Sequence, residues 1–189
     1  MVKAIINESR LVWVLKFTDV RSYIYAAIFV ALTVTVPWLL HRIPAAGATF
    51  LPMQYFVFIG GLVFGWRAGL VVGLISPVIS YCLSGMPVLP VLPQIVLEIS
   101  VYGVAAGLLR EKLSLGIAWS LAGAMIAGRL ALFAFLVVQS SFSAVYSPIG
   151  PAAGVLSSIW TTLSQSWPGI VIQLVSIPFI TAYIQKKIR

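Results

Sequence analysis

The stretch Gly85–Leu113, GMPVLPVLPQIVLEISVYGVAAGLLREKL, is apolar over most of its length. Its part from Val91 to Leu109 approaches the roughly 20 residues with which an α-helix crosses a bilayer. One carboxylate, that of Glu98, interrupts this apolar run, with Gln94 one helical turn before it and Tyr102 one turn after it. Residues at this spacing share one face of a helix. The stretch therefore predicts a transmembrane helix with one polar face.

The composition extends this interpretation to the whole chain. Of its 189 residues, 61% are hydrophobic and 8% are charged, whereas soluble domains carry about 25% charged residues. We expect an all-α fold, a polytopic membrane protein built as a bundle of six transmembrane helices. The predicted spans cover residues 22–40, 51–64, 68–83, 91–109, 115–139 and 158–184. The second and third are short, so that neighbouring residues continue them or they lie inside the bundle.

The basic residues predict how the bundle lies in the membrane. Of the twelve Lys and Arg residues, only Arg42 falls in a connection on the outer side, and Arg129 lies within the fifth span. The other ten precede the first span, follow the last or lie in the inner connections. By the positive-inside rule, both termini are cytoplasmic. As localisation we expect a prokaryotic plasma membrane, with the chain as a multi-pass protein.

The N-terminal segment, residues 1–21, differs from the transmembrane domain, residues 22–189. It mixes charged and apolar residues and lacks the apolar core and small-residue cleavage site of a signal peptide. We interpret it as a cytoplasmic amphipathic helix on the membrane surface. A partly disordered tail is the alternative.

Several classes of function are excluded or disfavoured. Cys82 and His41 are the only residues of their types, which removes intramolecular disulfides and His-rich zinc sites. The net charge of +8 comes from short clusters between apolar runs, not from a nucleic-acid-binding stripe. No phosphate loop or nucleophile–His–acid set is present. We therefore expect no enzyme, no cofactor and no bound metal.

The chemistry is predicted to lie at Glu98 and Arg129. Counted along their helices, they lie roughly 10 Å and 15 Å below the outer ends of their spans, so their depths overlap. A charge near the bilayer centre costs about 2.5–3.5 kcal/mol even on lenient scales, so both must face the bundle interior or an aqueous cavity. They either pair with each other or line an outward-opening pocket, where Arg129 would bind a ligand acid or carbonyl and Glu98 a ligand NH or OH. Both arrangements are compatible.

The sixth span adds candidate pocket residues near its outer end. Trp160 and Trp167 lie on one face, and Gln165 shares another with Gln173. A tryptophan at this depth is either an interfacial belt residue or a ring on which a flat ligand stacks. Pro168 and Pro178 are expected to interrupt this helix.

Small residues recur at four-residue spacing. Such rows let helix backbones approach closely in a membrane. The glycine rows, Gly65–Gly69–Gly73 and Gly103–Gly107, are interpreted as internal packing. The row Ala27–Ala31 in the first span either packs internally or is offered to another subunit.

Several segments together resemble a known family, the substrate-binding S components of energy-coupling factor (ECF) vitamin transporters. They are AAIFVALT (26–33), with its AxxxA spacing, and LPMQYFVFIGGLVFGWRAGLVVGLISPVIS (51–80). The segments SGMPVLPVLPQIVLEISVYGVAAGLL (84–109) and AMIAGRLALF (124–133) follow in the same order. With the six-span layout, the resemblance covers residues 22 to 189.

The resemblance implies a mechanism. An S component binds a scarce water-soluble vitamin or precursor outside, docks on a transmembrane T component that carries two ATPases, and topples to release the ligand inside. The AxxxA row, here Ala27 and Ala31, would face the T component. Glu98, Tyr102 and Arg129 would lie in the outer-half pocket, and Gln94, Trp160, Gln165 and Trp167 complete our candidate substrate-binding set. The alternative is a solitary proton-coupled transporter or channel for a small polar solute.

Overall fold

The computed structural model describes residues 20–40, 52–142, 146–147, 150–151 and 154–188. Within them, six helices follow one another: α2 (Val20–Leu40), α4 (Pro52–Phe64), α5 (Trp66–Ser84), α6 (Leu92–Glu111), α7 (Ile117–Ser140) and α8 (Val155–Ile188). The predicted all-α bundle of six helices is confirmed. A two-residue antiparallel ladder, β1 (Tyr146–Ser147) with β2 (Gly150–Pro151), lies between α7 and α8 and was not predicted.

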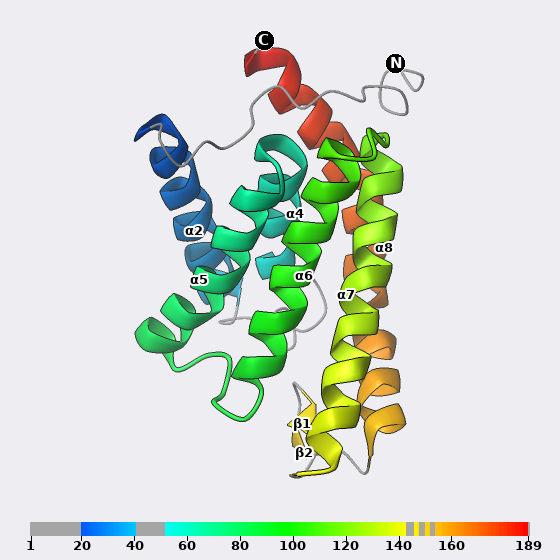
Figure 1. Ribbon diagram of the computed structural model, residues 1–189. Coiled ribbons are helices and arrows are strands. Elements are labelled where there is room, and N and C mark those ends of the chain that lie inside the picture. The colour runs from blue at the N-terminus through cyan, green and yellow to red at the C-terminus, as the bar shows by residue number, and fades with distance from the viewer. Residues whose placement is uncertain (1–19, 41–51, 143–145, 148–149, 152–153, 189) are drawn as a thin grey trace.

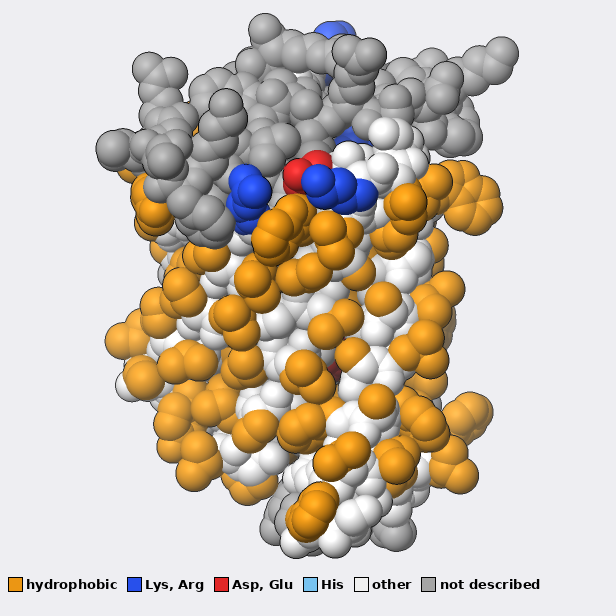
Figure 2. Space-filling view, viewed as in Figure 1, with side chains coloured by type: hydrophobic (Ala, Val, Ile, Leu, Met, Phe, Trp, Pro, Cys, Tyr) orange, Lys and Arg blue, Asp and Glu red, His pale blue; other side chains and the backbone are white. Residues whose placement is uncertain are grey.

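The helices run alternately up and down, so the start of α2 and the end of α8 lie at the same end of the bundle (Figure 1). Four helices, α5 to α8, are long and apolar enough to cross a membrane, and α2 and α4 contain shorter apolar stretches. Hydrophobic side chains cover the side of the bundle between its ends, and the visible Lys and Arg side chains gather at one end (Figure 2). This surface fits a lipid environment.

The short helix α4 is enclosed by its neighbours. Ten of its thirteen residues are buried, and it contacts α2, α5, α6 and α8. The bundle therefore surrounds a helix of 13 residues, shorter than a full crossing, as expected for a span placed inside it.

Glycines allow α5 and α6 to touch along their backbones. A Cβ atom at Gly69 would lie 2.2 Å from the carbonyl oxygen of Gly103, and one at Gly107 would lie 2.1 Å from the backbone nitrogen of Trp66. Real Cβ atoms do not approach other atoms this closely, so only glycine fits at these positions. The prediction that the glycine rows serve internal packing is confirmed.

Helix α8 corrects one expectation. It is a single helix of 34 residues that contains both Pro168 and Pro178 without an interruption. A proline within a membrane helix is tolerated because neighbouring helices and Ser or Thr side chains satisfy the freed backbone groups. Outside the described residues lie the N-terminal segment up to residue 19, His41, Arg42 and half of the long connection between α7 and α8.

Candidate functional site

An ion pair joins α6 to α7 inside the bundle. The Arg129 Nη1 atom lies 2.8 Å from Glu98 Oε1, and the Tyr102 hydroxyl donates a hydrogen bond of 2.6 Å to the same oxygen. Glu98 and Tyr102 are both buried. The predicted polar face of α6 therefore contains a hydrogen bond from Tyr102 to Glu98. Arg129 of α7 pairs with the same carboxylate.

Gly128, the residue before Arg129, makes room for the tyrosine. A Cβ atom at position 128 would lie 2.2 Å from the Tyr102 ring. On the other side, the Phe58 ring packs against that of Tyr102 with centroids 4.9 Å apart. The ring is thus held between α4 and α7, which aims its hydroxyl at the carboxylate.

Helix α8 adds a third contact to this cluster. Arg129 Nη2 donates to Ser166 Oγ at 3.4 Å, and the Ser166 hydroxyl donates to the Thr162 carbonyl oxygen at 2.6 Å. The guanidinium therefore bridges α6 and α8 from its place on α7. Because its contacts come from two other helices, its position depends on the packing of all three.

A cavity of about 400 Å³ lies beside the ion pair, between α4, α6, α7 and α8. This volume falls within the 300–1,000 Å³ that small-molecule pockets occupy. Its wall consists of Gln54, Tyr102, Met125, Ile126, Arg129, Leu130, Phe133, Ile159, Leu163, Ile170 and Gln173. The wall is therefore mainly apolar with a few polar groups, which is the usual composition of a ligand site.

The two charged residues differ in their relation to the cavity. Arg129 lines it, whereas Glu98 is not part of the wall, and their side chains are 18% and 7% exposed. Glu98 thus stands behind Arg129 and Tyr102. The structure shows the predicted mutual pairing of the two charges, and direct contact of either with a ligand stays a prediction.

The other predicted site residues lie at different places. Gln94 is buried on α6 but does not line the cavity, and Gln165 is half-buried and also outside it. Trp160 and Trp167 are 74% and 62% exposed on α8. The structure does not bring these two rings to the cavity, and their exposure fits the belt interpretation that the sequence left open.

Gln54 and Ser166 were missed as candidates, whereas Gln173 was named with Gln165 as possible pocket material. Gln54 and Gln173 line the cavity, and Ser166 contacts Arg129. The available signal was the helical spacing of Ser158, Ser166, Gln173, Thr181 and Gln185, all of them buried on α8. Polar residues repeated along one face of a membrane helix mark the face that points into the bundle.

The described residues contain no group of three or more His, Cys, Asp and Glu side chains that could hold a metal ion. The charged cluster instead has one carboxylate and one guanidinium, whose pairing the geometry already shows. Its chemistry is that of hydrogen bonding and charge compensation beside the cavity.

A comparison with protein families gives one match. The family model described as "ECF transporter, substrate-specific component" matches residues 21–185, nearly the whole chain. The chain belongs to this family. No curated protein and no solved structure matches it significantly.

As an S component, the chain is a multi-pass protein of the cell membrane and the substrate-specific subunit of a transporter. The predicted family and localisation are therefore confirmed. Its Ala27 and Ala31 are exposed on one face of α2, whereas Ala26, the residue before Ala27, is buried. The AxxxA row thus lies on the outside of the described bundle and not in its interior.

The tyrosine hydroxyl gives a first test of the site. A hydrogen bond to a charged group contributes about 1.5–3 kcal/mol and a neutral one about 0.5–1.5 kcal/mol. We predict that Tyr102→Phe lowers the free energy of unfolding more than Tyr55→Phe, whose hydroxyl donates to the neutral Ser176 hydroxyl at 2.7 Å. Denaturant titration of the detergent-solubilised variants measures both losses. Equal losses would show that Glu98 does not accept a charge-assisted bond from Tyr102.

Proposed function

We propose that this S component captures a small water-soluble molecule, a vitamin or vitamin precursor, from outside the cell. It then delivers this molecule to a transmembrane T component that carries two ATPase subunits. The observation that supports capture is a cavity of about 400 Å³ beside the charged cluster, in a chain that belongs to the S-component family. Binding and release without chemistry at the site fit its groups, which are carboxamides, a phenol, a guanidinium and apolar side chains.

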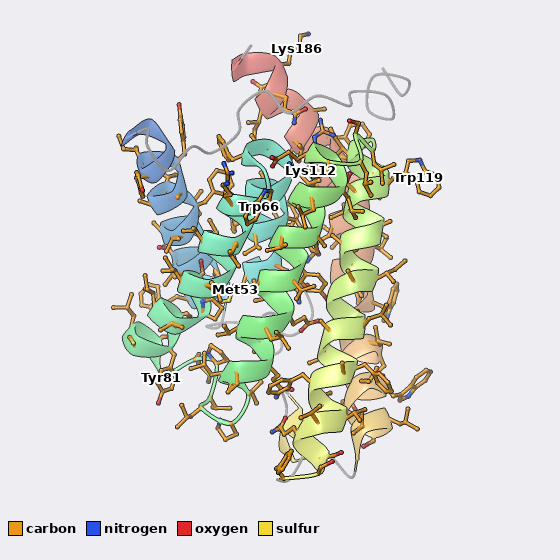
Figure 3. All side chains as sticks on the ribbon, viewed as in Figure 1. Met53, Trp66, Tyr81, Lys112, Trp119 and Lys186 are labelled. Carbon is orange, nitrogen blue, oxygen red and sulfur yellow. The ribbon has the colours of Figure 1, made fainter. Side chains whose placement is uncertain are left out.

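We propose that both termini are cytoplasmic. Lys112 and Lys186 lie toward the end of the bundle where α8 finishes, and Tyr81 lies toward the opposite end (Figure 3). Arg67 follows the first residue of α5, and Arg110 belongs to the last turn of α6, which places two more basic residues near that end. A cytoplasmic location of this end satisfies the positive-inside rule.

The topology is tested with a fluorescent protein fused after Arg189. We expect fluorescence from a reporter that folds only in the cytoplasm, because the positive charges hold this end inside. The matched control carries, at the same position, a phosphatase that is active only outside the cytoplasm. This phosphatase should be inactive. Phosphatase activity without fluorescence would contradict the orientation.

We propose that the AxxxA row on α2 is the docking surface for the T component. Ala27 and Ala31 are small and exposed, so another helix can approach the α2 backbone closely along this row. The site itself holds no phosphate loop, so the energy for release would come from the ATPases of the partner. Docking would thus connect the cavity to its energy source.

The docking proposal predicts different effects for two tryptophan variants. We expect Ala31→Trp to keep the bound small molecule and to lose the T component, because the bulky ring prevents close approach. Val175→Trp, which changes an exposed residue of α8, should keep both. Native mass spectrometry of each protein, purified gently from host membranes, reads the small molecule and the partner subunits together.

Two outcomes of that experiment would contradict the proposals. If Ala31→Trp lost the small molecule as well, or kept the T component, the row would not be the docking surface. If the unchanged protein carried no ATPase subunits and accumulated solute in proteoliposomes under a proton gradient alone, the proposed importer function would be wrong and a solitary transporter would replace it.

A further inference from the structure

The wall of the cavity is apolar for most of its extent. Seven of its eleven lining residues are Met, Ile, Leu or Phe, and the polar ones are two glutamines, a tyrosine and an arginine. Burial of apolar surface contributes about 25 cal/mol per Å², so such a wall favours a ligand with an apolar body. Polar parts of a ligand must meet the few polar groups of the wall, since an unpaired polar group costs free energy when buried.

The one charge on the wall is already compensated. Of the lining residues, only Arg129 is charged, and its guanidinium lies 2.8 Å from the carboxylate of Glu98 behind it. The pair is therefore neutral as seen from the cavity. An anionic ligand would either add an uncompensated negative charge or displace Glu98 from Arg129, and both leave a buried carboxylate without its partner.

A neutral ligand meets suitable partners in the same place. A guanidinium has five N–H donors, and the contacts with Glu98 and Ser166 leave donors that can serve a ligand carbonyl. The carboxamide of Gln54 also lies at the wall and carries both donor and acceptor groups. These groups can bind carbonyl, amide or hydroxyl functions without any change in net charge.

The cavity also opens toward the hydrophobic outer surface. Leu130 and Phe133 of α7 and Leu163 of α8 line the cavity and are at the same time exposed on the outside of the bundle. Leu130 and Phe133 lie in the middle part of α7, and Leu163 lies in the first third of α8. A ligand at the opening between α7 and α8 would therefore meet leucine and phenylalanine side chains, which again favours an apolar body.

We infer that the cavity takes an uncharged small molecule that combines an apolar body with carbonyl, amide or hydroxyl groups. The inference deepens the proposed function by naming the chemical class of its substrate, and it rests on that function. Arg129 and Gln54 bind the polar functions, and the apolar wall binds the body. Glu98 is a positioning residue that keeps Arg129 in place and cancels its charge.

The test uses two fluorescent probes that share one skeleton and differ in a single charged group. N-phenyl-1-naphthylamine is uncharged, and 1-anilinonaphthalene-8-sulfonate carries an added sulfonate. Each is titrated into the isolated protein in lipid nanodiscs, with empty nanodiscs as background. Two variants show where the probe binds. Leu130→Trp fills the cavity opening, and Val175→Trp adds the same ring elsewhere on α8. The two replaced side chains are similarly exposed, at 63% and 59%.

Above the nanodisc background, we expect one component of the binding curve of the uncharged probe to come from the cavity. Leu130→Trp should remove this component, and Val175→Trp should leave it unchanged. In this component, the uncharged probe should bind about tenfold or more tightly than the sulfonate, because burial of an unpaired charge is costly. If the sulfonate bound the same component equally well or better, the inference would be overturned. It would also be overturned if neither probe showed a component that depends on residue 130.

Gel filtration recognises a folding defect of the Leu130→Trp variant, and Leu163→Trp replaces it in that case. The titrations use the isolated chain, so they require neither the T component nor ATP. A failed charge selection with intact delivery to the ATPase complex would refute the substrate class alone. Missing ATPase partners with intact charge selection would refute the proposed importer alone.

Discussion

The ion pair between Glu98 and Arg129 is the interaction on which the arrangement of the site depends. Either charge alone would cost about 2.5–3.5 kcal/mol or more at the centre of a bilayer. The pair at 2.8 Å, with the Tyr102 hydroxyl on the same carboxylate oxygen, compensates both. It also requires that α6 and α7 keep one register, since a shift of either helix by one residue would separate the partners.

Small residues make this register possible. Gly128 leaves space for the Tyr102 ring beside α7, and Gly69 and Gly103 bring α5 and α6 into backbone contact. The enclosed helix α4 then supports the ring through Phe58. Packing with glycines and the buried charges are thus parts of one arrangement, in which the first positions the second. What remains between α4, α6, α7 and α8 is a cavity with a neutral wall.

Much of this was accessible from the sequence because lipid imposes strong rules. Apolar length located the six helices, the rarity of charge drew attention to Glu98 and Arg129, and glycine spacing indicated close packing of helices inside the bundle. The rest depends on rotation and tertiary context. Trp160 and Trp167 were assigned to the candidate site from their residue type. The rotation of α8 about its axis, however, is set by buried polar residues such as Ser166 and Gln173. Likewise, Pro168 does not interrupt α8, because its neighbours support the helix.

The most direct test of the central claim is a double-mutant cycle on the free energy of unfolding with Glu98→Gln, Arg129→Gln and both together. If the two charges hold each other, each single variant leaves a buried charge unpaired and loses about 3–5 kcal/mol. The double variant then loses much less than the sum of the two, since no charge remains to be compensated. Strictly additive losses would contradict the account, and so would a Glu98→Gln variant as stable as the unchanged protein.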